Sequence, residues 1–208
     1  MPLSQISPPW WGDKPVILVG GGPSLRGFDF RRLASLDAYV VGINQAIFDA
    51  PCHAGVTIDR KFVANREREL EIAAQWIPVY TAYPFNGAIW LRRRVGRGLS
   101  TDPTTIITIG TSGYAGVNVA VLKRARRIVL LGYDYGEGER THYHDAYPWR
   151  DSAQTWPWGK WAAAYESMLP TLRELDIEVL NASPKSAITC FRKISLGALF
   201  EQGHKTTA

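Results

Sequence analysis

The stretch VILVGGGPSLRGFDF, residues 16–30, carries an apolar run straight into three glycines, a proline and a serine. The run predicts a buried β-strand over 15–20, and the residues behind the turn predict a short helix over 28–35. Glycine lets backbone amides approach a ligand closely, and a proline suits the first turn of a helix, whose free N–H groups attract anions. Two interpretations stay open, a tight connection or a phosphate cradle, because the turn has neither GxGxxG spacing nor a P-loop lysine. The turn comprises Gly20, Gly21, Gly22, Pro23 and Ser24.

Short β-branched runs alternate with longer segments of helical period along the rest of the chain. Further strands are predicted over 38–44, 53–59, 77–82, 104–109, 126–135 and 177–183. Helices are predicted over 60–76, 112–125 and 158–175, the last bent at Pro170, with short closing helices over 184–191 and 195–202. This alternation predicts one α/β domain over 1–208, with a Rossmann-like, doubly wound, mostly parallel sheet of about six to seven strands and helices on both faces. Residues 83–103 and 136–157 are expected to be loop excursions over the active site.

The bulk composition excludes several classes of protein. A length of 208 residues with 46% hydrophobic residues is typical of one globular domain. No signal peptide and no apolar run of membrane-spanning length is found, so we expect a cytoplasmic protein without a membrane span. Cys52 and Cys190 lie far apart, which argues against a disulfide framework or a cysteine zinc site. The net charge of +5 favours a polyanionic partner, and the oligomeric state is not predicted.

Ligands bind beyond the carboxyl ends of the strands in such sheets, so the residues just after each strand are the candidate binding residues. A carboxamide pair after the second strand suits a base edge or ribose hydroxyls, and the alternative is a turn or helix cap. Asp59 suits a hydroxyl or a metal, with a helix N-cap as the alternative. The hydroxyl-rich turn before residue 114 suits the nucleotide, and Asp134 suits a ribose, a metal or a structural amide. The candidates are Asn44, Gln45, Asp59, Thr111, Ser112, Gly113 and Asp134.

The stretch THYHDAYPWRD, residues 141–151, contains two of the four histidines of the chain. His142 or His144 suits a general acid or base beside a nucleotide pocket. A metal pair would need a third ligand, such as Asp134 or His53. Plain loop histidines are the remaining alternative.

Basic and tryptophan-rich segments provide candidates for the acceptor or for phosphate. Arginines in LRRRVGRG are either a solvated face or a polyanion contact, and the tryptophans after residue 148 are either core or the wall of a pocket for a flat or sugar-like ligand. The candidates are Arg92, Arg93, Arg94, Trp149, Trp156, Trp158 and Lys185.

Four stretches together, VILVGGGPSLRGFDFRRL…YVVGINQAIF, TSGYAGVNVAVLKRARRIVLLGYDY, HYH and IEVLNASPKSAI, resemble the bacterial, metal-independent sialyltransferases. The resemblance covers about Pro15 to Leu196, and it extends equally to archaeal-type hydroxymethylpterin diphosphokinases and to small bacteriophage proteins. For a sialyltransferase it implies that Gly20, Gly22, Pro23, Ser24, Asn44, Gln45 and Ser112 contact a CMP donor. It also implies that Tyr143 touches the phosphate and that a histidine of the same loop is the base.

Two positions depart from the sialyltransferase pattern. That family has an asparagine in the middle of the first turn, where this chain has Gly21. Its catalytic histidine stands three residues beyond the loop tyrosine, whereas here His144 follows Tyr143 directly.

Three functions follow as hypotheses. The first is a nucleotide-dependent transferase, in particular a glycosyltransferase that needs no cofactor and moves a sugar from a nucleotide-activated donor to an acceptor hydroxyl, such as that of a hydroxymethylated base in phage DNA. The second is a diphosphokinase that needs magnesium, with Asp134 and Asp59 as ligands. The third is a nucleotide or nucleic-acid binding module without activity.

Overall fold

The computed structural model of the chain describes residues 5–7, 9–136, 141–147 and 156–201. Its strands are β1 (Val16–Val19), β2 (Tyr39–Ile43), β3 (Ala54–Thr57), β4 (Val79–Thr81), β5 (Ile89–Trp90), β6 (Arg92–Val95), β7 (Thr105–Thr108), β8 (Arg127–Leu131), β9 (Glu178–Asn181) and β10 (Arg192–Lys193). Its helices are α1 (Ala46–Asp49), α2 (Arg60–Asn65), α3 (Glu67–Ala73), α4 (Ser112–Leu122), α5 (Trp158–Ala164), α6 (Leu169–Glu174) and α7 (Leu196–Glu201). Three short 3₁₀ helices are η1 (Pro23–Leu25), η2 (Phe30–Ser35) and η3 (Tyr165–Met168).

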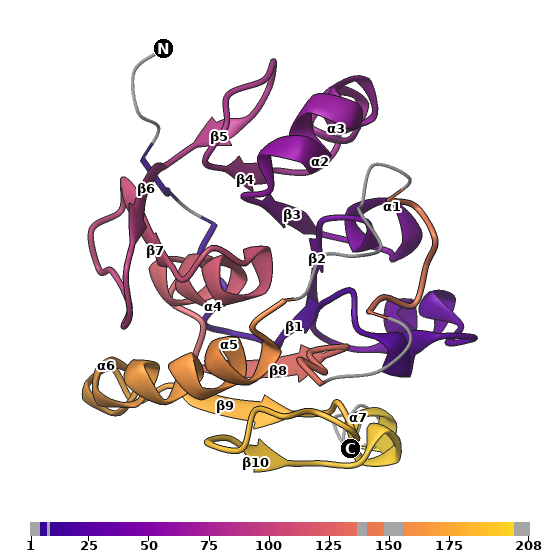
Figure 1. Ribbon diagram of the computed structural model, residues 1–208, viewed down its shortest axis with the longest axis vertical. Coiled ribbons are helices and arrows are strands. Elements are labelled where there is room, and N and C mark those ends of the chain that lie inside the picture. Colours follow the sequence, from indigo (N-terminus) through magenta and orange to yellow (C-terminus); the bar gives the residue numbers. More distant parts are fainter. Residues whose placement is uncertain (1–4, 8, 137–140, 148–155, 202–208) are drawn as a thin grey trace.

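The main sheet has eight strands in the order β10-β9-β8-β1-β2-β3-β4-β5, and each neighbouring pair is parallel (Figure 1). The predicted fold class is thus confirmed, with eight strands instead of six or seven. β1 is paired with β2 on one side and with β8 on the other, so the strand order reverses beside β1. Such a reversal opens a crevice at the carboxyl ends of the strands.

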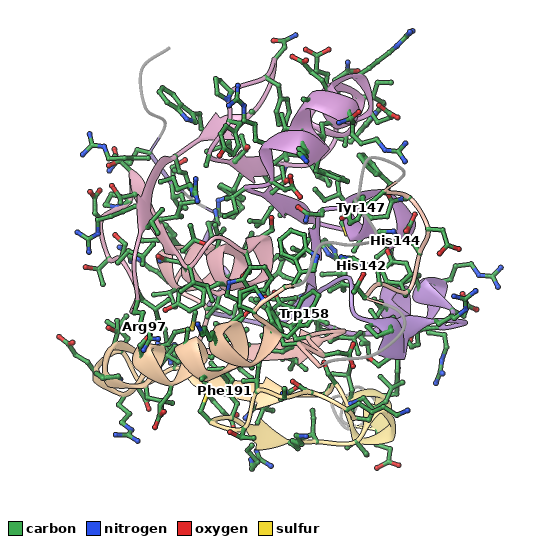
Figure 2. All side chains as sticks on the ribbon, viewed as in Figure 1. Arg97, His142, His144, Tyr147, Trp158 and Phe191 are labelled. Carbon is green, nitrogen blue, oxygen red and sulfur yellow. The ribbon has the colours of Figure 1, made fainter. Side chains whose placement is uncertain are left out.

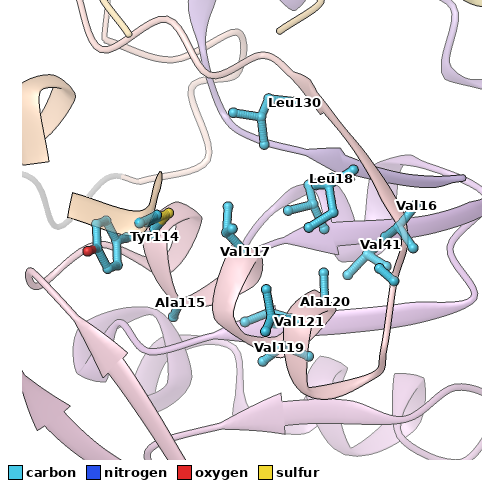
Figure 3. Packing of buried hydrophobic residues seen from close by; sticks show 14 of the residues in the cluster. Val16, Leu18, Val41, Tyr114, Ala115, Val117, Val119, Ala120, Val121 and Leu130 are labelled. Atoms are coloured by element: carbon cyan, nitrogen blue, oxygen red, sulfur yellow. The ribbon is translucent and has the colours of Figure 1, made fainter. Parts of the chain in front are cut away.

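Helices cover both faces of this sheet because alternate residues of its central strands are apolar on both sides. Val16 and Leu18 belong to the core that α4, η3 and α6 cover, whereas Ile17 and Val19 belong to the core under η1, η2, α1 and α7. Figure 1 shows α4–α6 on the left of β1 and β2 and α1 and α7 on the right. Figure 3 shows α4 packed on the first of these cores through Val117 and its neighbours. No helix of the described ranges is long and apolar enough to cross a membrane.

Residues 83–103, predicted as a loop, contain β5 and β6 instead. β6 is the sequence Arg92-Arg93-Arg94-Val95, all of it exposed, and it pairs with β7 in a separate two-stranded sheet. The prediction was wrong because this pairing uses main-chain hydrogen bonds, whereas the side chains of β6 have no apolar alternation. The predicted strand 104–109 exists as β7, but it belongs to this small sheet.

Three predicted helices also differ from the structure, of which the helix over 60–76 is divided at Arg66 into α2 and α3. Residues 184–191 form no helix, because the Ala187 N–H donates to the Asp134 carbonyl at 2.7 Å and the Ile188 N–H to Ser186 Oγ at 3.2 Å. The bond to Asp134 ties the segment to the end of β8. The predicted helix 158–175 is divided into α5, η3 and α6, with Pro170 in the first turn of α6, where its missing N–H costs nothing.

Candidate functional site

A cavity of about 330 Å³ opens at the carboxyl ends of the strands, beside the point where the strand order reverses. Its walls come from the turns after β1, β2, β3, β7 and β8, from residues 141–147 and from α5. The predicted candidates that line it are Gly20, Gly21, Gly22, Asn44, Asp59, Arg93, Thr111, Ser112, Gly113, Asp134, His142, Trp156 and Trp158. Pro23, Ser24, Gln45, Arg92, Arg94, Tyr143, His144 and Lys185 do not line it, and Trp149 lies outside the described residues.

The glycine turn after β1 packs against the end of β8. The Gly20 N–H donates to the Leu131 carbonyl at 2.7 Å, and the Gly22 N–H donates to the Gly132 carbonyl at 2.8 Å. A Cβ atom on either glycine would lie 2.6 Å from the Gly132 oxygen, which real Cβ contacts do not show. The glycines are therefore needed for the close approach of two strand ends, which is the tight-connection interpretation of this turn.

Asp134 is buried at the end of β8 and is held by the same turn. Its Oδ2 atom accepts from Ser24 Oγ at 2.8 Å and from the Ser24 N–H at 3.3 Å. Its Oδ1 atom is buried and has no hydrogen-bond partner among the described residues. A buried acceptor left without a donor is costly, so Oδ1 is suited to a donor on a ligand.

Asn44 ends β2 in a left-handed conformation, with φ of 53°, which asparagine tolerates better than most residues. Its Oδ1 atom is likewise buried without a hydrogen-bond partner in the described part of the chain. Gln45 Oε1 is also buried without a hydrogen-bond partner among the described residues, but Gln45 Nε2 donates to Asp49 Oδ1 at 3.0 Å and the residue lies outside the cavity lining. Of the carboxamide pair, only Asn44 therefore lines the cavity.

The first turn of α4 forms another wall of the cavity. Thr111 caps the helix, its Oγ1 accepting from the Tyr114 N–H at 3.3 Å, and Ser112 Oγ accepts from the Ile58 N–H at 3.0 Å. Both hydroxyl oxygens thus accept hydrogen bonds from the protein backbone. The N–H groups of Ser112 and Gly113 belong to the first turn, where no intrahelical acceptor exists, and together with the helix dipole they favour an anion.

Asp59 caps α2, with Oδ1 accepting from the N–H groups of Lys61 at 2.9 Å and Phe62 at 3.1 Å. It also lines the cavity, as does Asp134, so both carboxylates of the magnesium hypothesis border the same space. Each already has one oxygen bonded within the protein. Within the described residues, no three His, Cys, Asp or Glu side chains form a group that could hold a metal ion.

His142 lies over Gly21, which is one of the two positions that depart from the sialyltransferase pattern. A Cβ atom on Gly21 would come within 2.9 Å of the His142 ring, so a larger residue would require the ring to shift. His142 Nδ1 is 2.9 Å from Thr141 Oγ1, and the ring contacts Tyr147 with centroids 5.0 Å apart. Figure 2 shows His142, His144 and Tyr147 grouped together, with Trp158 at the nearest end of α5. His142 therefore has direct access to the cavity.

Tyr143 and His144 turn toward the protein instead. The Tyr143 hydroxyl donates to Asp49 Oδ2 at 2.7 Å, and burial, together with this carboxylate, raises the pKa of Tyr143. His144 Nδ1 accepts from the Ala146 N–H at 3.1 Å. The structure thus brings one of the three loop candidates to the cavity.

Four tyrosines, Tyr114, Tyr133, Tyr135 and Tyr165, pack beneath the first turn of α4. Tyr135 OH is 3.1 Å from Thr111 Oγ1 and accepts from Tyr165 OH at 2.9 Å, and Tyr133 OH donates to the Gly113 carbonyl at 3.2 Å. Burial raises the pKa of Tyr133, Tyr135 and Tyr165, so their hydroxyls stay protonated at neutral pH. This network fixes the turn that faces the cavity.

Replacing Tyr135 by phenylalanine is expected to lower the free energy of unfolding by about 1–3 kcal/mol, because the buried Tyr165 hydroxyl loses its acceptor. Urea unfolding monitored by circular dichroism measures the change. Tyr39→Phe is the matched control, since the Tyr39 hydroxyl has no hydrogen-bond partner among the described residues, and it should change stability by less than about 0.5 kcal/mol. Equal effects of the two variants would contradict the role of the network.

Sequence reasoning missed several residues of the cavity wall, among them Arg60, Tyr83, Tyr135, Tyr147 and Trp161. Arg60 directly follows the candidate Asp59, and Trp161 stands one helical turn after Trp158, so both had a local signal in the sequence. Tyr83 and Tyr147 are brought to the cavity only by the path of the chain.

No family model and no curated protein matches the sequence. Among solved structures, the chain is similar to the sialyltransferase CstII from Campylobacter jejuni in complex with a substrate analogue, cytidine-5′-monophosphate. The two chains are 16% identical with a TM-score of 0.51, and the alignment covers 88% of this chain and 86% of that chain. The protein therefore has a sialyltransferase-like α/β fold. At this identity the similarity concerns the fold alone.

Proposed function

We propose that the protein is a glycosyltransferase that moves a sugar from a nucleotide-activated donor to an acceptor hydroxyl. The observation that carries the proposal is that Asn44 and Asp134 line one cavity and that each has a buried side-chain oxygen, Oδ1, without a hydrogen-bond partner among the described residues. Hydrogen-bond donors on a ligand, such as the hydroxyls of a ribose or the amino group of a base, would satisfy these two oxygens. The sialyltransferase-like fold supports a nucleotide, because the solved neighbour is in complex with cytidine-5′-monophosphate.

The anionic part of the donor is proposed to bind at the first turn of α4. The N–H groups of Ser112 and Gly113 and the positive end of the helix dipole offer an anion site there. The glycine turn after β1 is less suited, because the N–H groups of Gly20, Gly22 and Ser24 are already bonded within the protein. The glycines then shape the cavity and do not bind the phosphate.

His142 is proposed as the general base. The acceptor hydroxyl transfers its proton to the His142 ring while its oxygen bonds to the anomeric carbon of the sugar. The bond from that carbon to the phosphate oxygen breaks, and its electron pair leaves on the nucleotide phosphate. The α4 turn then stabilises the charge that develops on the leaving group. No metal takes part in this scheme.

A thermal-shift panel with CMP, UMP, UDP, GDP and ATP, each with magnesium and with EDTA, tests the proposal. A nucleotide at about 100 times its Kd should stabilise the fold by about 2.7 kcal/mol. In a chain of this length that raises Tm by about 5–10 °C. We expect a shift with a pyrimidine nucleotide that EDTA does not remove. A shift seen only with magnesium and a triphosphate would favour the diphosphokinase instead.

Asn44→Gly is the variant that tests the binding residue in the same assay. Glycine tolerates the φ of 53° at this position, so the variant removes the carboxamide without straining the backbone. We expect the Tm of the free protein to stay near the wild-type value and the nucleotide shift to fall by half or more. An unchanged shift would remove Asn44 from the site.

A further inference from the structure

The cavity has an aromatic wall that the nucleotide proposal does not use. Trp156, Trp158 and Trp161 line it, with ring centroids 5.3–6.2 Å apart, and Tyr135 contacts Trp158 at 6.2 Å. All three tryptophans are only partly buried, although they pack against one another. Aromatic faces that line a cavity are suited to stacking on a flat ring.

Two arginines line the same cavity from other elements. Arg60, the first residue of α2, is exposed and has no hydrogen bond or ion pair with any described residue, and Arg93 Nη1 donates to Tyr83 OH at 3.3 Å. The two lining carboxylates are engaged elsewhere, Asp59 with the N-terminus of α2 and Asp134 with Ser24. Both guanidinium groups therefore lack an acidic partner in the described ranges.

Positive charge continues from Arg93 along β6. Arg92 and Arg94 are exposed on the same strand, and Arg97 is exposed just beyond it. Side chains alternate along a strand, so Arg93 faces the cavity while its neighbours lie on the other side of β6.

We infer that the acceptor is an unpaired base of a polynucleotide, stacked on the tryptophan wall with its flanking phosphates at Arg60 and Arg93. Stacking surfaces combined with a basic groove are typical of proteins that bind single-stranded nucleic acid. Tryptophan faces in general also suit a neutral sugar, but a neutral sugar would make no use of the arginines. A base inside a duplex cannot reach the wall unless it leaves the stack. The inference rests on the proposed function in one respect, namely that a hydroxyl group of the bound acceptor receives the sugar.

The test measures binding of a fluorescein-labelled single-stranded DNA of about 12 nucleotides by anisotropy, together with quenching of tryptophan fluorescence. The same strand as a duplex and the neutral sugar maltohexaose are the comparison ligands. We expect the single strand to bind more tightly than the duplex, to quench the tryptophans, and to weaken steeply between about 50 and 200 mM salt. Maltohexaose is expected to cause no quenching.

Two pairs of variants locate the site. Trp158→Ala is expected to weaken binding of the single strand about 5- to 150-fold, and Trp158→Phe should retain most of the wild-type affinity. Trp76→Ala is the control and should leave the affinity unchanged, because Trp76 lies just beyond α3 and is 82% exposed. Arg93→Gln should lower the salt slope by about 0.7, as the loss of one phosphate contact does. Arg173→Gln removes an equal charge from the exposed side of α6 and should leave the slope unchanged.

The inference is overturned if maltohexaose quenches the tryptophans and the oligonucleotide does not bind. It is also overturned if the paired variants have equal effects, since binding would then be a property of net charge alone. Failure of the proposed function looks different. In that case the single strand still binds at Trp158 and Arg93, and no nucleotide of the thermal-shift panel raises Tm.

Discussion

Replacing His142 by alanine is expected to lower kcat for sugar transfer by about 10²–10⁴-fold, the range that a general base contributes. The affinity for the nucleotide should stay the same, because His142 is proposed to act on the acceptor proton and not on the donor. The measurement is kcat and KM with the nucleotide-sugar selected by the thermal-shift panel. The tertiary structure makes His142 the choice within its loop, because its ring lies over Gly21 and lines the cavity.

His144→Ala and His53→Ala are the matched controls for this experiment. His144 accepts from the Ala146 N–H outside the cavity lining, and His53 accepts from the Val40 N–H at 3.0 Å at the other end of the strands. Both variants should retain far more activity than His142→Ala. The assignment of the base is wrong if the result is reversed. In that case His144→Ala lowers kcat by about 10²–10⁴-fold, and His142→Ala keeps the wild-type kcat.

Gly22→Ala is expected to lower the free energy of unfolding by about 3 kcal/mol or more. The backbone at Gly22 has φ of −63° and ψ of 149°, which alanine adopts readily, so the effect is steric. The added Cβ atom would overlap the Asp134 carboxylate and lie 2.6 Å from the Gly132 carbonyl oxygen, which is backbone and cannot move aside. Displacing Asp134 would also break its two hydrogen bonds with Ser24.

Gly159→Ala is the control for Gly22→Ala. Gly159 lies in α5, where an added Cβ atom would meet nothing within 4 Å, so alanine should be neutral or raise stability by up to about 1 kcal/mol. Thermal unfolding distinguishes the two variants, since a loss of 3 kcal/mol corresponds to a fall in Tm of about 6–12 °C. A Tm of Gly22→Ala close to that of Gly159→Ala would mean that the turn and the end of β8 do not pack as described.

The fold class could be predicted because the central strands carry their own signal. β1, β2, β3 and β8 are short apolar runs that are buried on both faces, and such runs stand out in any reading of the sequence. β6 could not be predicted, since its residues are three arginines and an exposed valine held by main-chain pairing with β7. Residues 184–191 were mistaken for a helix because the Ala187 N–H and Ser186 Oγ donate to the carbonyls of Asp134 and Tyr133, which lie far away in the chain.

The candidate site, like the fold, was predicted in part from the sequence. The rule that ligands lie at the carboxyl ends of strands selected Asn44, Asp134 and the turn before α4, and the cavity lies there. The same rule could not separate Asn44 from Gln45, since both follow β2 and only the direction of the side chain distinguishes them. Tyr83 and Tyr147 were missed because nothing local in the sequence marks them as lining residues of the cavity.

The sequence by itself determined the alternation of the central strands with helices and the chemical types present at each strand end, because hydrophobic period and turn residues are local properties. Only the tertiary structure decided what each of those residues does. Gly21 is a small residue in the sequence, and it becomes the space for the His142 ring once residues 141–147 lie over the turn. Such roles depend on contacts between segments more than 100 residues apart, and close packing, which no local pattern encodes, selects them.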